Sequence, residues 1–101
     1  MDESKEDIRV RLDRQAQTLF FSVTCDFEQF PQLAARLCQC LDLQVVAQEW
    51  GADRHQWLVE FEGTRLWLHF ESYSTSCWLS CQQPQDMDVL QYLQTLWESQ
   101  Q

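Results

Sequence analysis

The chain has 101 residues, 45% of them hydrophobic, and its 16 acidic and 7 basic side chains give a formal net charge of −9 at pH 7. With only two glycines and two prolines, it is not collagen-like, of low complexity or multidomain. Its charge and scattered bases disfavour binding to nucleic acids and to anionic membranes. We expect residues 1–101 to form a single domain with one core, in which residues 1–7 are disordered.

Five cysteines in a chain with no visible export signal indicate reduced thiols and a cytoplasmic location. No apolar run approaches the roughly 20 residues that are needed to cross a bilayer. Cys38 and Cys40 would point to nearly opposite sides of a predicted helix, and Cys77 and Cys81 would lie about 13 Å apart on a predicted strand. Because a metal would then need Cys25 or a histidine from elsewhere, we expect no metal site and no cofactor.

Apolar residues alternate with charged ones over residues 8–12, which predicts a half-buried first strand. Residues 18–24 are rich in aromatic and β-branched side chains and predict a second strand. The polar residues 13–17 between them would turn the chain. These segments should form an antiparallel hairpin.

The apolar period changes to three and four over residues 30–41, which predicts an amphipathic helix. Asp26 and Gln29 resemble a capping box, but Pro31 would then lie inside the helix. We therefore expect a short turn at residues 27–29 and a regular helix from about Phe30, with Pro31 in its first turn.

Four further strands are predicted after this helix, at residues 43–50, 55–62, 64–71 and 77–82. The middle two should form a hairpin around Gly63, with a loop at Glu62-Gly63 or at Gly63-Thr64. Either register keeps the apolar faces together and places an acid opposite Arg65.

Residues 84–88 break the last strand and begin a closing helix. Its buried stripe is predicted to contain Val89, Leu90, Leu93, Leu96 and Trp97. The element order β-β-α-β-β-β-β-α predicts an α+β fold, in which two helices pack on one face of an antiparallel sheet of about six strands.

Three segments carry a family resemblance: residues 30–37 (FPQLAARL), 49–57 (EWGADRHQW) and 76–79 (SCWL). With these segments the chain resembles a small family of uncharacterised proteins from gamma-proteobacteria, a domain of unknown function. The resemblance covers most of the chain and implies a bacterial cytoplasmic protein. Since the family has no assigned activity, no functional residues can be carried over.

Asp53, Arg54 and His55 gather an acid, a base and a histidine in one turn and are candidate ligand-binding residues. In a catalytic arrangement Asp53 would orient His55 as a general base, with Cys25 or a serine as the nucleophile. No nucleophile lies close in the sequence and nothing supplies an oxyanion hole. The simpler interpretation is that Gly51 and Asp53 build the turn, so we expect no catalytic residues and no enzymatic activity.

Leu58, Trp67, His69 and Trp78 fall on the outward positions of the predicted strands. A sheet face in contact with water should be polar, whereas this one has an aromatic centre and a polar rim, as contact surfaces do. A loop or the N-terminal strand could instead cover it. We expect a non-enzymatic protein-interaction module, either a homodimer or an adaptor. The alternatives are a small-molecule binder or small enzyme at the Asp53-Arg54-His55 turn, and an acidic inhibitor of a basic surface.

Overall fold

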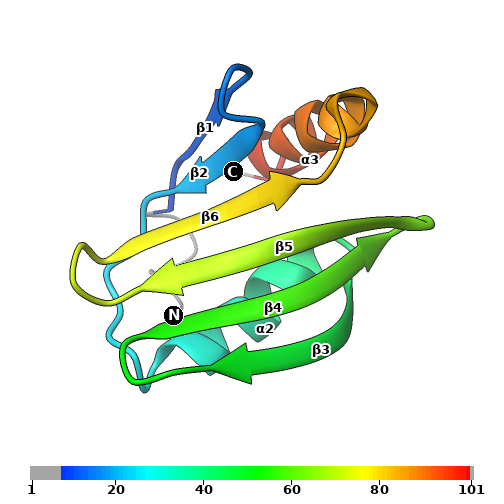
Figure 1. Ribbon diagram of the computed structural model, residues 1–101. Helices are drawn as coiled ribbons and strands as arrows, with labels where there is room; N and C mark the ends of the chain where they lie inside the picture. The colour runs from blue at the N-terminus through cyan, green and yellow to red at the C-terminus, as the bar shows by residue number, and fades with distance from the viewer. Residues whose placement is uncertain (1–7, 101) are drawn as a thin grey trace.

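A six-stranded antiparallel sheet with the order β1-β2-β6-β5-β4-β3 frames the molecule in this computed structural model, which describes residues 8–100 (Figure 1). The strands are β1 (Val10–Asp13), β2 (Thr18–Phe21), β3 (Gln44–Trp50), β4 (Arg54–Phe61), β5 (Thr64–Glu71) and β6 (Ser76–Cys81). The helices are α2 (Phe30–Cys40) and α3 (Met87–Glu98), and a short 3-10 turn, η1 (Pro84–Asp86), leads into α3. The predicted α+β class and element order are confirmed. The expectation for residues 1–7 lies outside the described residues.

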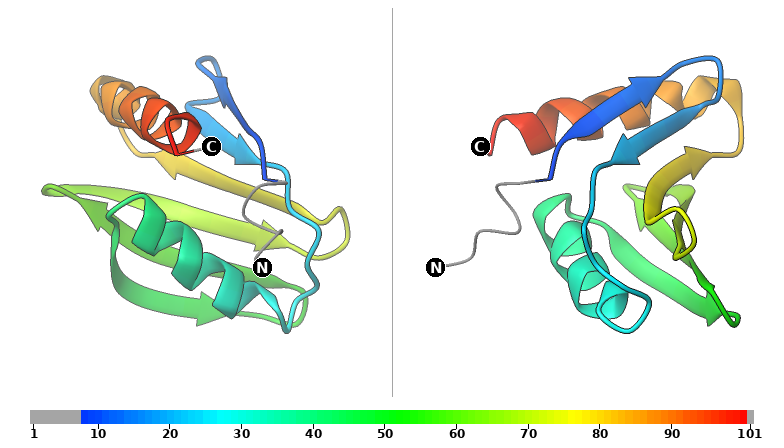
Figure 2. Two further views of the ribbon diagram at one scale, coloured as in Figure 1. Left: turned by 180° about the vertical axis from the view of Figure 1, so that it is seen from behind. Right: turned by 90° about the vertical axis from the view of Figure 1, so that its left-hand side faces the viewer.

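Both helices lie on the same side of the sheet (Figure 2). Helix α3 packs along β1, β2 and β6, whereas α2 crosses behind β4 and β5 and leads the chain to the far edge strand, β3. We call the side that carries the helices the inner face and the opposite side the outer face. Within residues 8–100, no helix has the length and apolar character that a membrane span requires.

The first hairpin is shorter than predicted, because β1 starts at Val10 and β2 ends at Phe21. Just beyond β2, the N–H of Ser22 still donates to the carbonyl of Arg9 at 2.9 Å. The N–H of Arg9, however, donates to the hydroxyl of Ser22 at 2.8 Å rather than to a backbone carbonyl. A side chain therefore takes the place of the next ladder bond and ends the regular pairing.

Helix α2 begins at Phe30, as predicted, and Pro31 lies in its first turn. The N–H of Asp26 donates to Oε1 of Gln29 at 3.1 Å, and the N–H of Gln29 donates to Oδ1 of Asp26 at 2.8 Å. The two residues thus make the reciprocal bonds of a capping box around the turn at 27–29, before the regular helix starts.

The hairpin of β4 and β5 adopts the register that pairs Val59 with Leu66 and Glu60 with Arg65. Its two-residue loop has positive φ at both positions, 48° at Glu62 and 87° at Gly63. Positive φ at both central residues is the requirement of a type I′ turn, whose twist matches that of the flanking strands. The glycine therefore selects one of the two predicted registers.

The core lies between the inner face and the helices and includes Phe30, Leu68, Leu79 and Leu90, each at most 1% exposed. The Phe30 ring stacks on Phe70 with centroids 4.8 Å apart, which anchors α2 to β5. Trp57 and Trp97 are buried, as their positions on the predicted inner stripes require. Val89 and Leu96 are only partly buried at the margin of the core.

Candidate functional site

No element of residues 8–100 covers the outer face, which is turned toward the viewer in Figure 1. The strand registers align its side chains in two adjacent rows that run across the sheet. The first row is Arg11, Phe20, Trp78, His69, Gln56 and Glu49, and the second is Thr18, Ser80, Trp67, Leu58 and Ala47.

The four predicted contact residues are direct cross-strand neighbours on this face. Leu58 lies opposite Trp67, and His69 lies opposite Trp78 in the next row. The His69 and Trp78 rings stack at 4.9 Å with an interplanar angle of 10°. All four side chains are half-buried. The structure therefore brings the four together into one surface, which we call the aromatic patch.

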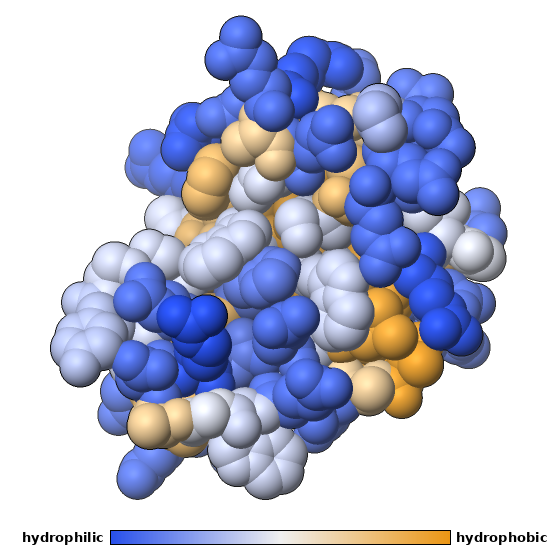
Figure 3. Space-filling model, in the orientation of Figure 1, coloured by the Kyte–Doolittle hydropathy of each residue, from blue (hydrophilic) through white to orange (hydrophobic). Residues whose placement is uncertain are grey.

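Polar and charged groups border the aromatic patch. Nε2 of His69 lies 3.1 Å from the Ser80 hydroxyl, and the Arg11 guanidinium sits over the Phe20 ring, 4.5 Å from its centroid. Burial, and to a smaller extent the charge of Arg54, lowers the pKa of His69 below its usual range. The imidazole is therefore neutral at physiological pH, which suits its position between two tryptophans. Figure 3 shows this face as a mixture of blue and pale surface, with the most strongly hydrophobic area at the lower right and smaller hydrophobic areas in the upper half.

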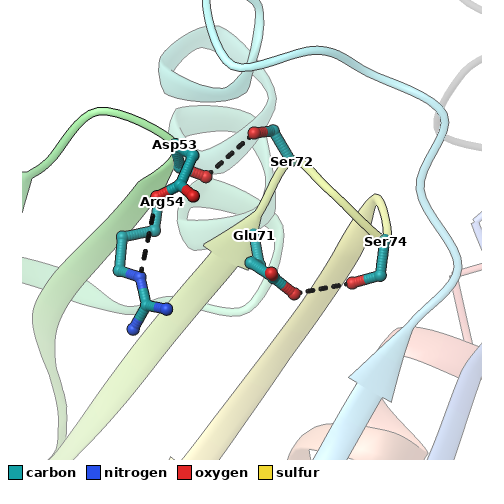
Figure 4. Close-up of polar contacts among 5 residues, drawn as sticks. All are labelled: Asp53, Arg54, Glu71, Ser72 and Ser74. Atoms are coloured by element: carbon teal, nitrogen blue, oxygen red, sulfur yellow. Dashed lines mark hydrogen bonds and ion pairs between the residues drawn. The ribbon is translucent and has the colours of Figure 1, made fainter.

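The Asp53-Arg54 part of the predicted turn makes mainly structural contacts (Figure 4). The Asp53 carbonyl accepts two bonds from Ser72, from its N–H and its hydroxyl, each at 2.9 Å. The Asp53 carboxylate lies 4.0 Å from Nε of Arg54, in an exposed ion pair. Glu71 accepts a bond from the Ser74 hydroxyl at 2.7 Å. The two bonds between Ser72 and Asp53 join the β3–β4 turn to the β5–β6 turn.

His55 points away from Arg54, into the inner side of the sheet, and is 5% exposed. Its ring stacks on Phe27 at 4.1 Å, and its Nε2 lies 2.8 Å from the Phe27 carbonyl. Nδ1 is buried and has no hydrogen-bond partner in the described part of the chain. The ring is thus oriented by Phe27 and not by Asp53, so the structure does not form the acid–base pair considered from the sequence.

The cysteines have the properties of packed side chains. Burial raises the pKa of Cys38 to about 12 and also raises the pKa of Cys77. The pKa of Cys25 is raised by burial and by the neighbouring Asp26, so the thiolate is disfavoured there as well. Over residues 8–100, no three His, Cys, Asp or Glu side chains come together in a way that could hold a metal ion.

Sequence reasoning missed a groove on the inner side of β3. It has a volume of about 410 Å³, and its walls include Phe27, Trp50, His55 and Trp57, with Glu28 beside them. We call it the aromatic groove. It joins the turn before α2 to two strands that are more than 20 residues further along the chain. The alternation that puts Trp50 and Trp57 on one face was visible in the sequence, but the position of Phe27 depends on how α2 crosses the sheet.

Comparison with known proteins identifies the chain at the level of its family. No curated protein and no solved structure matches it. Residues 8–98 match the family described as Protein of unknown function, DUF3630. This match confirms the predicted resemblance to a domain of unknown function, while the gamma-proteobacterial setting stays a prediction. The chain belongs to the DUF3630 family.

Proposed function

We propose that this protein is a non-enzymatic protein-interaction module of the bacterial cytoplasm, that it binds through the aromatic patch, and that its partner is a second copy of itself. The observation that carries the proposal is the position of both helices on the inner face. This arrangement leaves Leu58, Trp67, His69 and Trp78 without a covering element in the described chain. A cytoplasmic location is supported by five cysteines that are all free thiols.

The composition of the patch supports protein binding over simple solvation. Tryptophan is among the residues that contribute most to protein interfaces, and two tryptophans from adjacent strands lie at the centre of this face. The half-buried residues around them can form a rim that excludes water from the contact. His69 adds a ring that carries no charge at physiological pH, so burial of the patch does not require desolvation of an ion.

The charge distribution supports a second copy as the partner. The chain as a whole repels its own copies, but both signs of charge occur on the outer face. Arginines there can lie opposite carboxylates of the other subunit in an isologous contact, in which the same patch serves both subunits. The charged residues of this face are Arg11, Asp13, Glu49, Arg54, Glu60, Arg65 and Glu71.

Absolute mass by light scattering over a range of concentrations tests the proposal. The wild type should show twice the chain mass, and Trp67→Glu should shift the protein toward the monomer, because a charge would be buried without a partner. Tyr73→Glu is the matched control, since Tyr73 is an aromatic residue in the β5–β6 turn and is 85% exposed. This control should leave the mass unchanged.

Circular dichroism separates a binding defect from a folding defect. Trp67 is half-buried on an uncovered face, so Trp67→Glu should retain the wild-type spectrum. If Trp67→Glu unfolds, His69→Asp provides a second disruption of the same patch. A wild type that remains monomeric at every concentration, or a folded Trp67→Glu variant that remains dimeric, would refute self-association through this patch.

A further inference from the structure

The aromatic groove lies on the other side of the sheet from the aromatic patch and at its β3 edge. Trp50 lines this groove, and 68% of its surface is accessible. All seven residues of β3 are exposed, and in the described sheet β3 is an edge strand that pairs with β4. Within residues 8–100, no element covers the groove, so a ligand can reach the indole of Trp50.

The walls of the groove include three aromatic side chains whose faces can attract a cation. Trp50 and Trp57 contribute indoles and Phe27 a benzene ring, and Phe27 is held in place by its stacking on His55. Aromatic faces carry a negative quadrupole potential, which attracts cations, and indole does so most strongly. The volume of about 410 Å³ exceeds what a small organic cation needs.

The formal charge beside the groove is negative, like the potential at the faces of the aromatic rings. Among the lining residues within 8–100, Glu28 provides the one carboxylate, and none is a lysine or an arginine. Asp26 lies two residues before Glu28 in the same turn. The N-terminus of α2 adds a partial positive charge of about half a unit, which is smaller than the charge of the Glu28 carboxylate alone. The local potential is therefore negative, in keeping with the net charge of −9.

His55 adds an unsatisfied polar atom beside these walls. Its Nε2 is bonded to the Phe27 carbonyl and therefore carries a hydrogen, and its Nδ1 is buried and has no hydrogen-bond partner among the described residues. A buried polar atom without a partner in the wall of the groove is a feature that a bound ligand could satisfy.

We propose that the aromatic groove is a binding site for an organic cation, such as an alkylated ammonium group, held by cation–π contact with Trp50 and by the carboxylate of Glu28. The site is independent of the aromatic patch, because it uses the other face and other residues. A dimerisation-defective Trp67→Glu variant should therefore bind the cation as the wild type does.

The test compares a cation with its neutral isostere. Choline chloride and 3,3-dimethylbutan-1-ol have the same shape and differ in the charge of the central atom. Titrations at constant ionic strength are followed through the indole N–H signal of Trp57 in nuclear magnetic resonance spectra. Choline should give a saturable shift, and the neutral alcohol should bind about tenfold more weakly.

Variants assign the effect to the groove. Trp50→Leu should abolish the saturable shift, and Glu28→Gln should weaken choline binding about threefold or more. Tyr73→Leu is the control, because it removes an exposed aromatic residue that does not line the groove, and the variant should bind as the wild type does. Trp50 and Glu28 are both exposed, so these substitutions should spare the fold.

Three results would each overturn the proposal. They are equal affinity for choline and the neutral alcohol, unchanged choline binding in a folded Trp50→Leu variant, and no saturable shift up to about 50 mM choline. Should Trp50→Leu unfold, Glu28→Gln together with the comparison of the two ligands decides the question.

Discussion

The two faces of the sheet are built from alternate residues of the same strands, yet they have different roles. On β5, Leu68 faces inward and is 1% exposed, whereas its neighbours Trp67 and His69 face outward and are half-buried. The inner face is apolar and packs against both helices, while the outer face combines aromatic rings with charges of both signs. The inner face therefore provides stability, and the outer face can be altered with little cost to the fold.

The largest expected effect is a difference in stability between two leucine-to-alanine variants, one on each face of the sheet. Leu68→Ala should lower the free energy of unfolding by about 2–5 kcal/mol, because it leaves a cavity in a closely packed core. Leu58→Ala removes the same atoms from the uncovered face and should cost less than about 1.5 kcal/mol. Urea denaturation of both variants measures the difference. Equal losses would show that the outer face is packed as tightly as the core.

A buried polar bond beside the inner face should have the next largest effect. Nε1 of Trp97 donates to the Ile8 carbonyl at 3.0 Å and ties α3 to the chain just before β1. Trp97→Phe removes this buried hydrogen bond, which should cost about 1–3 kcal/mol beyond the lost volume. The exposed Trp50 provides a matched control, and Trp50→Phe should change thermal stability little. Equal melting temperatures for Trp97→Phe and Trp50→Phe would show that this hydrogen bond contributes little to stability.

His69 should make stability depend on pH from the outer face. Its pKa is lower in the folded protein than the ordinary value of about 6.5, so the unfolded chain binds more protons as the pH falls below that value. The contribution of His69 is therefore fully present above about pH 6.5 and is lost as the pH falls through the folded pKa. Urea midpoints at about pH 5.5 and pH 7.5 should differ less in His69→Gln than in the wild type. Identical differences would exclude this role.

The smallest expected effect concerns the exposed ion pair of the outer face. Nε of Arg65 lies 3.5 Å from Oε1 of Glu60, across the β4–β5 hairpin. Such pairs contribute about 0.2–1 kcal/mol, so Arg65→Ala should destabilise the protein slightly, and less so at high salt. A double-mutant cycle with Glu60→Ala measures the coupling energy. A coupling above about 2 kcal/mol would mean that the outer face is less exposed to solvent than its accessibility indicates.

Periodicity predicted both helices and strands β4, β5 and β6, because each of these elements has one buried side. Strand β3 has no buried side, since all seven of its residues are exposed. Periodicity did not decide between the two registers of the β4–β5 hairpin, since both satisfy the apolar pattern. That choice depends on the backbone conformation of Glu62 and Gly63. Similarly, residues 22–24 have strand-forming composition, but they leave the ladder once Ser22 bonds to Arg9 with its side chain.

The same distinction, between what the local pattern predicts and what depends on tertiary packing, applies to the candidate sites. The outward position of the four residues of the aromatic patch was predictable, because both possible registers of the β4–β5 hairpin keep these side chains on the same face. The orientation of His55 was not, because Phe27 binds it across 28 residues of sequence separation. Asp53 lies only two residues before His55, but it belongs to the turn, so closeness in the sequence did not predict which groups are in contact. To predict the contact between Phe27 and His55, the position of α2 on the sheet would have to be known, and the local sequence pattern does not give it.

The edge strand β3 presents backbone groups with which a strand of another chain could pair. Gln44–Trp50 contains no lysine and no proline, the residues that commonly protect edge strands from pairing with other chains. The register shift between Val45 and Ala47 interrupts the regular ladder, so only the second half of β3 presents a uniform row of backbone groups. Because bulges turn an edge strand away from regular pairing with other chains, we expect a substitution that restored the regular ladder of β3 to favour edge-to-edge association.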